Sequence, residues 1–322
     1  MSTTAPFSYH NDGQSPLPPP RVLKTFTSVE PNFIVTPPLG YWATYSVKEQ
    51  VDEDAEAILI HAYHKSANNF LRWGVRPTGA SGYWEVMGYS LIQRWAIVKL
   101  NAEKEFDLYC QGLNQMDFWL LGYFNSNIVL FNTLYNRVPY DRYWQTVDFS
   151  DVLPATGCEA LIVLYGCHTG GWPSGIRAYG STDNHYKSRR PNYAIVKNND
   201  RKVDIYKYRT GEESFWRCAL VGYFRDGASF YTNSAPISMA GLGSWEAKAA
   251  TAHYPNPSLV VCEQTAVSTL DPVGSRKRLG DHAWTYRTYG GSHMMTHPDT
   301  SGRFDLYREH AETYFYYLGS LD

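Results

Sequence analysis

The sequence predicts an all-β protein built from three tandem antiparallel β-sandwich repeats, of jelly-roll or immunoglobulin-like type, with an extended N-terminal arm. The chain of 322 residues is too long for one average hydrophobic core. Aromatic residues make up 16% and charged residues only 19%, a composition that favours strands over charged amphipathic helices. Short apolar runs bounded by turn residues recur along the chain, and one pattern is repeated three times.

The repeated pattern is an aspartate flanked by aromatic residues, followed by an apolar run with a glycine. It reads "FDLY" and "LLGYF" in the first copy, "VDIY" and "LVGYF" in the second, and "FDLY" and "YLGSL" in the third. A tryptophan precedes each copy, at positions 42, 144 and 245. Anchors that recur in the same order at nearly constant spacing indicate tandem duplication of one structural unit.

The spacing predicts four segments. They are a Pro-rich arm at 1–37, and repeats at 38–135, 136–236 and 237–322. The arm contains "SPLPPPR" and "TPPLG", which favour an extended backbone without a core of its own. It is either a tail or an arm laid along a neighbouring chain. The three repeats either form a pseudo-symmetric trimer or follow one another as beads.

Within each repeat, a nearly continuous apolar run predicts a buried central strand. These runs are "AEAILIHAY", "EALIVLYG" and "PSLVVCEQT". "WAIVKLN" and "YAIVKNN" predict further strands that end in polar turns, and the aspartate and glycine runs predict the last two strands. Gly122, Gly222 and Gly319 interrupt the last strand, so we expect a bulge or a close backbone approach there.

Several classes of function are disfavoured. A net charge of −2 provides no field that would attract nucleic acid. The N-terminus lacks a signal peptide, and no stretch is long and apolar enough to insert into a membrane, so we expect synthesis in the cytoplasm. The GxSxG, P-loop, GxGxxG and HExxH motifs do not occur, so no enzyme activity is predicted; a glycan-active enzyme with dispersed carboxylates is the less favoured alternative.

No metal or other cofactor is predicted. The five cysteines form no CxxC pair, and we expect free thiols, with a Cys158–Cys167 or a Cys167–Cys218 bridge left open. His61 and His64 are three positions apart on a predicted strand, so their imidazoles should point to opposite faces.

Arginine loops offer the candidate sites. "WGVRPTG", "SGIRAYG" and the weaker match "RKRLG" space three arginines 101 residues apart. The favoured interpretation is a structural ion pair in every repeat, because both partners recur. The pairs are Arg76–Asp107, Arg177–Asp204 and Arg278–Asp305. The alternative is a ligand site repeated at the first two of these loops, in which aromatic side chains bind sugar rings. Its residues would be Arg76, Trp84, Trp172, Arg177 and Tyr179.

The "A-I-V-K…D-[LI]-Y…L-[LV]-G-Y-F" run and the "G-[VI]-R-x-x-G" loop, over residues 38–322, resemble tandem β-sandwich virion proteins of tailed bacteriophages. Decoration proteins, head fibres and tail adhesins are of this kind. The resemblance implies a non-enzymatic structural or attachment protein of a virion or other extracellular assembly. It also implies many copies per particle, with capsid, tail or self-association partners and an anchoring N-terminal segment. A carbohydrate-binding adhesin that recognises a host surface glycan is the alternative.

Overall fold

The computed structural model is an arrangement of β-strands, and the part of the chain that it describes contains no helix, hence none long enough to cross a membrane. The described residues are 25–34, 40–65, 71–81, 85–88, 93–111, 115–137, 142–167, 173–185, 192–208, 216–250, 257–266, 272–277, 284–287 and 292–322. The strands form six antiparallel sheets, two in each of three units.

In the first unit, the inner sheet has the order β1-β8-β3-β6 and the outer sheet has the order β2-β7-β4-β5. The inner strands are β1 (Phe26–Ile34), β8 (Met116–Phe124), β3 (Ala57–His64) and β6 (Gln93–Lys99). The outer strands are β2 (Trp42–Ser46), β7 (Glu105–Cys110), β4 (Leu71–Pro77) and β5 (Glu85–Gly88). Eight strands divided between two sheets in this order make a jelly roll.

The second and third units repeat this order. The second has β9 (Ile128–Asn136), β15 (Trp216–Phe224), β11 (Ala160–Cys167) and β13 (Asn192–Lys197) in its inner sheet, and β10 (Tyr143–Asp148), β14 (Lys202–Lys207) and β12 (Ser174–Ala178) in its outer sheet. The third has β16 (Ala228–Ile237), β23 (Thr313–Leu321), β18 (Leu259–Ala266) and β21 (Ser292–Thr296), and β17 (Ser244–Ala249), β22 (Arg303–Arg308), β19 (Pro272–Lys277) and β20 (Trp284–Arg287). The predicted fold class is therefore confirmed, as the jelly-roll type.

The strand pairing moves the predicted boundaries towards the N-terminus by about one strand. β1, which lies within the predicted arm, pairs with β8 of the first unit, and β9 and β16 pair with the last strands of the second and third units. The repeated tryptophan marks the second strand of each unit and not the first, which is why boundaries drawn from it fall too late. The segment "SPLPPPR" at 15–21 and residues 35–39 lie outside the described residues.

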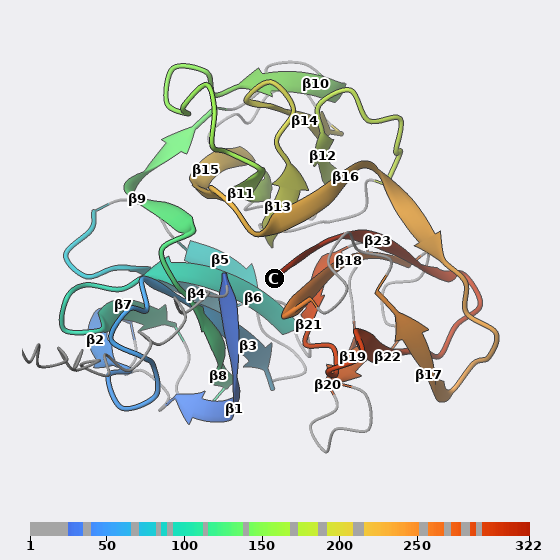
Figure 1. Cartoon of the computed structure of the whole chain (residues 1–322), viewed down its shortest axis with the longest axis horizontal. Helices are drawn as coiled ribbons and strands as arrows, with labels where there is room; N and C mark the ends of the chain where they lie inside the picture. Colours follow the sequence, from blue (N-terminus) through green and yellow to red (C-terminus); the bar gives the residue numbers. More distant parts are fainter. Residues whose placement is uncertain are drawn as a thin grey trace, which may run out of the picture.

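The three units are arranged around a common centre, where the C-terminus lies (Figure 1). Each unit's last strand passes into the next unit's first strand through three residues, at 125–127 and 225–227. Both links contact residues at the start or the end of the described chain. The backbone N–H of Phe26 donates to the carbonyl of Asp322 (3.1 Å), and the N–H of Asp322 donates to the carbonyl of Gly227 (3.0 Å). Asn127 Nδ2 donates to Thr25 Oγ1 (3.0 Å), so the three units close into a ring.

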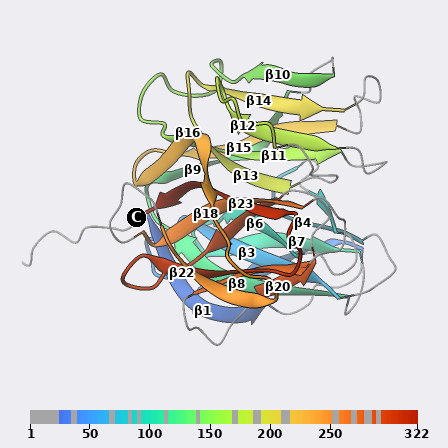
Figure 2. The same cartoon turned by 90° about the vertical axis from the view of Figure 1, so that its right-hand side faces the viewer.

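The central strands of the inner sheets are buried on both faces. In β11, Leu161 and Val163 pack inside their own sandwich, whereas Ile162 and Leu164 pack in a cluster shared with the other units. Figure 2 shows the outer strands β10 and β14 farthest from the other units, whereas β13 of the inner sheet lies on the side that faces the third unit. This double burial explains the continuous apolar runs of the sequence and confirms the predicted buried strands.

The repeated glycine lies at a close backbone approach. A Cβ atom on Gly122, Gly222 or Gly319 would lie 2.5, 2.2 or 2.4 Å from the carbonyl oxygens of Thr27, Val129 and Ser229, respectively. The register of the last strand shifts beside this glycine in all three units. Both the expected bulge and the expected close approach are found.

Candidate functional site

A set of five residue types recurs on the outer sheet of every unit, and the first unit shows its geometry. Arg76 of β4 lies opposite Asp107 of β7, with Nε 3.1 Å from Oδ2. The guanidinium carbon of Arg76 lies 4.2 Å from the centre of the Trp42 ring. Trp42 pairs with Tyr109, and their rings are 5.5 Å apart. On the other neighbouring strand, β4, Gly74 lies opposite Tyr109 and leaves space for the Tyr109 ring.

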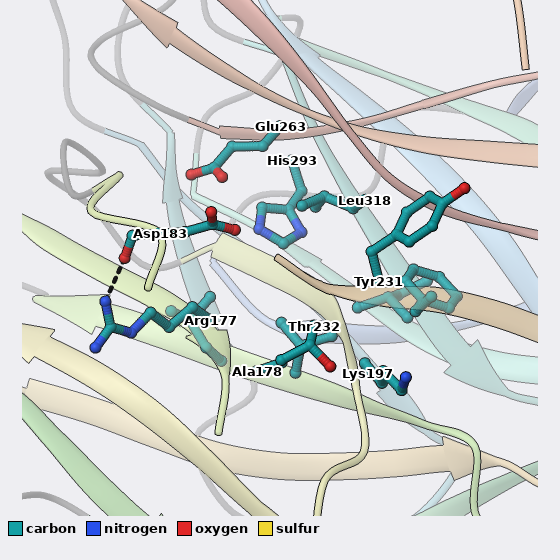
Figure 3. Close-up of a pocket in the computed structure, with 13 residues that line it drawn as sticks. Arg177, Ala178, Asp183, Lys197, Tyr231, Thr232, Glu263, His293 and Leu318 are labelled. Atoms are coloured by element: carbon teal, nitrogen blue, oxygen red, sulfur yellow. Dashed lines mark hydrogen bonds between the residues drawn. The ribbon is translucent and has the colours of Figure 1, made fainter. Parts of the chain in front are cut away.

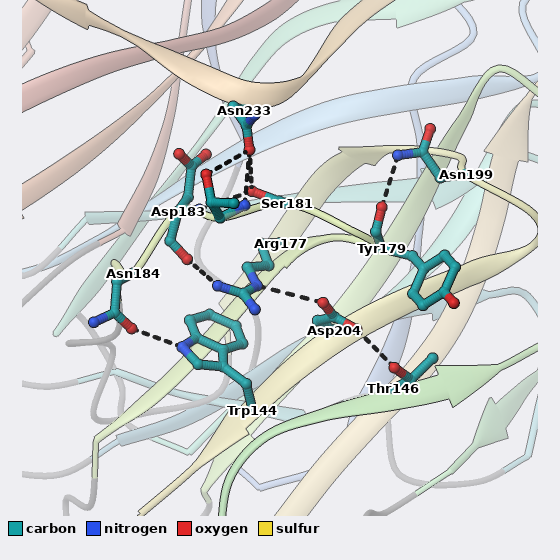
Figure 4. Close-up of polar contacts among 11 residues, drawn as sticks. Trp144, Thr146, Arg177, Tyr179, Ser181, Asp183, Asn184, Asn199, Asp204 and Asn233 are labelled. Carbon is teal, nitrogen blue, oxygen red and sulfur yellow. Dashed lines mark hydrogen bonds and ion pairs between the residues drawn. The ribbon is translucent and has the colours of Figure 1, made fainter.

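The second unit repeats this arrangement (Figure 4). Arg177 Nε lies 3.4 Å from Asp204 Oδ2, and its guanidinium carbon lies 4.1 Å from the centre of the Trp144 ring. Trp144 packs against Tyr206 at 5.6 Å, and Gly175 lies opposite Tyr206. The structure therefore brings Arg177 and Asp204 together, as it does Arg76 and Asp107.

The third unit contains the same set, but with a different arginine from the predicted one. Arg276 lies opposite Asp305, with Nε 2.9 Å from Oδ2, and its guanidinium carbon lies 4.4 Å from the centre of the Trp245 ring. Gly274 lies opposite Tyr307, at the position that Gly74 and Gly175 occupy in the other units. The alignment was displaced by two residues because "RKR" offers two arginines, and Arg278 lies outside the described residues.

Within each set, the charge of the arginine is paired with the charge of the aspartate. Tryptophan covers one face of each guanidinium, and the carboxylate accepts the Nε–H, which are favourable cation–π and charge-assisted contacts. The arginine side chains are only 19%, 18% and 23% exposed in the three units. The hydroxyls of Thr44 and Thr146 also donate to Asp107 and Asp204, each at 2.9 Å. Each set thus joins three strands of an outer sheet and leaves little of the arginine for a ligand.

Of the five residues of the predicted repeated ligand site, the structure describes Arg76, Arg177 and Tyr179. Arg76 and Arg177 lie on the outer sheets of different units. Tyr179 is 37% exposed, and Lys202 Nζ lies 5.2 Å from the centre of its ring. Trp84 and Trp172 lie outside the described residues.

A second site, which the sequence did not reveal, lies between the second and third units (Figure 3). His185 Nδ1 is 3.0 Å from Glu263 Oε2, and the His185 ring lies 3.8 Å from the ring of Tyr316. A cavity of about 20 Å³ adjoins them and is lined by Asp183 and His293 among others. This volume accommodates one water molecule and excludes a sugar ring.

Burial controls the electrostatics of this site. Burial raises the pKa of Glu263, although the hydrogen bond from His185 opposes that effect. Burial alone would lower the pKa of His185, but the hydrogen bond and charge of Glu263 outweigh it and the pKa is raised. His293 has no such partner, and burial lowers its pKa to about 3. The sequence signal for this site was Glu263, a carboxylate within a run that predicts a buried central strand.

Among the described residues, no group of three or more histidine, cysteine, aspartate or glutamate side chains is placed to hold a metal ion. Cys158 and Cys218 are free thiols, so neither bridge left open by the sequence forms. Burial raises the pKa of Cys158 to about 12, which keeps it protonated and unreactive at neutral pH.

No family model matches the chain, and no curated protein matches it. Among solved structures, a chain from the atomic structure of Sulfolobus Turreted Icosahedral Virus is similar, with 10% identity and a TM-score of 0.24 over 92% of this chain and 91% of that one. A chain from the structure of the lipid-containing bacteriophage PM2 has 9% identity and a TM-score of 0.15, over 92% and 87%. Both come from viruses, but similarity this low adds nothing to a fold that rests on the strand pairing.

Proposed function

We propose that the chain is a non-enzymatic structural protein of a virus particle, in which one polypeptide supplies a preassembled ring of three jelly rolls. The ring carries this proposal, because its inner sheets share one core and its outer sheets all face away from it. A closed ring of three similar units presents three similar outer faces, as a symmetric trimer does. Such a block is suited to repeated contacts in a shell or spike, and jelly rolls are common modules of viral capsids.

The buried ionisable groups support a non-enzymatic role. The buried Glu263 carboxylate and His293 imidazole lie between two units, beside a cavity with room for one water molecule. An organic substrate could not reach them without separating the units. The arginine sets of the outer sheets are occupied by their own aspartates and tryptophans.

The proposal is tested by locating the protein in particles. Antibodies raised against the recombinant chain should label particles purified from a culture that produces it, in immunogold electron microscopy, and peptides from all three units should be abundant in those particles. Detection of the protein only in the particle-free fraction would contradict the structural role.

Within this structural role, the chain would be a capsid-decoration, fibre or adhesin component that its N-terminal segment anchors to the particle, as in tailed bacteriophages. The anchor would be residues 1–24, because Thr25 already lies at the centre of the ring and Phe26 belongs to β1. Deletion of residues 1–24 should leave the ring folded and abolish its incorporation into particles. Incorporation at the wild-type level would exclude the anchor without affecting the structural role.

A carbohydrate-binding adhesin is the second candidate, favoured by exposed aromatic rings on the second unit. Tyr143 is 62% exposed, has a backbone φ of 70°, and packs against Tyr206 at 6.2 Å. Strained non-glycine residues often mark functional sites, and exposed rings suit sugar faces. A glycan array should then detect binding that Tyr143→Ala or Tyr179→Ala removes and Tyr314→Ala retains. Binding that all three variants retain would exclude this surface.

A further inference from the structure

The three inner sheets present different side chains at equivalent positions, which are residues directly paired across β8, β3 and β6, across β15, β11 and β13, and across β23, β18 and β21. In the first unit they are Trp119, His61 and Trp95. In the second unit they are Ala219, Leu164 and Tyr193. In the third unit they are Tyr316, Glu263 and His293. Only the third unit combines a carboxylate with an imidazole in this row.

This row of the third unit is covered by polar groups of the second unit. His185 contacts both Glu263 and Tyr316, and Asp183 adds a negative charge nearby. Asp183 is itself held by the N–H of Ser234, at 2.6 Å from Oδ2. The other charged groups around the cavity are Arg177, which is bound to Asp204, and Lys197 of β13.

His293 is a buried imidazole of this seam, and one of its ring nitrogens is left without a partner among the described residues. It is 3% exposed, and its Nδ1 has no hydrogen-bond partner among the described residues. Tyr165 of the second unit lies 6.4 Å from its ring, and Trp95 of the first unit donates to its carbonyl at 2.8 Å. An imidazole held this way is surrounded by all three units and can take up a proton only at a high cost in desolvation.

We propose that the seam between the second and third units is the pH-sensitive contact of the ring, closed near neutral pH and loosened by acid. His185 and Glu263 hold it closed across the two units, and His293 is the residue whose protonation requires the seam to open. The seam between the first and second units, where Leu164 and Tyr193 lie, has no carboxylate and imidazole at the equivalent positions. Its closure should not depend on pH in this way. This inference rests on the ring and is independent of the proposed role in a virus particle.

The sign follows from the direction of each pKa. His293 has a lowered pKa, so below the ordinary imidazole value of about 6.5 the open state binds a proton that the closed state does not, and closure weakens. Glu263 and His185 have raised pKa values, so the closed state binds protons more tightly at these two groups. The stabilisation that these two groups give to the closed seam is greatest at low pH. It is lost as the pH rises through their pKa values in the closed state. They therefore oppose the effect of His293, and the seam should be tightest near the ordinary pKa of histidine.

Hydrogen exchange, read by mass spectrometry and corrected for the intrinsic pH dependence of exchange, tests the proposal. One proton taken up on opening changes protection by about 10-fold per pH unit. Between pH 6.5 and 5, protection in β18 and β21 should fall by up to about 30-fold, whereas β9 and β6 should change much less. This comparison needs no variant. An equal fall at both seams would overturn the proposal.

Two variants separate the groups. His293→Tyr installs the residue of the second unit and should abolish the fall in protection, which would persist if some other group were responsible. Glu263→Gln keeps an acceptor for His185 but removes the opposing titration. This variant should lower protection at pH 7 and show an acid-induced fall at least as large as that of the wild type. A smaller fall would contradict the role given to Glu263.

Discussion

At the scale of single residues, the set of tryptophan, glycine, arginine, aspartate and tyrosine is the most regular feature of the molecule. The sequence predicted the arginine and aspartate partners in the first two units, because both recur at a constant spacing. It did not predict that Trp42 covers Arg76, although that tryptophan also recurs. The two residues are on different strands, and only the strand order of the jelly roll brings them together.

The third unit lacks the threonine that accompanies this set in the other two units, and restoring it is a test of the set's hydrogen bonding. Ala247 lies opposite Asp305, where Thr44 and Thr146 lie opposite their aspartates in the other units. Ala247→Thr should add a hydroxyl donor to Asp305 and raise the free energy of unfolding by about 1 kcal/mol. Urea denaturation measures this change. Ala247→Val adds the same branching without the hydroxyl, so equal stabilisation by both variants would show that strand propensity and not the hydrogen bond is responsible.

The repeated glycine gives a second test at this scale. In Gly222→Ala the added methyl group would lie 2.2 Å from the carbonyl oxygen of Val129, so the backbone must shift. We expect a loss of about 3 kcal/mol in the free energy of unfolding. Gly241→Ala is the control, because its methyl group would meet side-chain atoms alone, Ser244 Oγ at 3.1 Å and Glu246 Oε1 at 3.5 Å. Equal, small effects in the two variants would contradict the close approach.

At the scale of elements, the central strands were predictable and the first strands were not. β3, β11 and β18 are buried on both faces and each contains a continuous apolar run. β1, β9 and β16 each pair with a single neighbouring strand in their sheets, and the pairing register of each is interrupted. β1 and β16 also contain a proline. Polar residues and proline are typical of edge strands, which resemble loops in sequence.

A truncation series tests the new boundary. Deletion of residues 1–24 should leave the melting temperature within a few degrees of the full chain, because the hydrogen bonds that close the ring begin at Thr25 and Phe26. Deletion of residues 1–34 removes β1 and its buried Phe26, whose ring lies 4.8 Å from that of Phe124. Loss of this edge strand should lower the free energy of unfolding by about 2–4 kcal/mol for the buried aromatic residue alone, and the melting temperature by at least about 3–6 °C below that of the shorter deletion. Equal melting temperatures for the two truncations would restore the boundary at residue 37.

At the scale of the whole molecule, the sequence left open whether three repeats form a trimer-like body or a string of beads. The structure gives the first answer, because apolar residues of all three inner sheets share one cluster. The sequence contained part of this information, since strands that are apolar on both faces need a second partner. It could not show which surface supplies that partner, because the contact depends on how the three sandwiches are oriented.

The closed ring is the central claim, and circular permutation tests it most directly. The permuted chain would start at Asn127, with Asp322 joined to Thr25 by a short glycine linker and residues 1–24 removed. Because the backbone of Phe26 already bonds to that of Asp322, this connection should need no rearrangement. The ring predicts a soluble monomer with one cooperative thermal transition within a few degrees of the chain that lacks residues 1–24. A permuted chain that aggregates or melts in separate steps would show that the units do not close on one another.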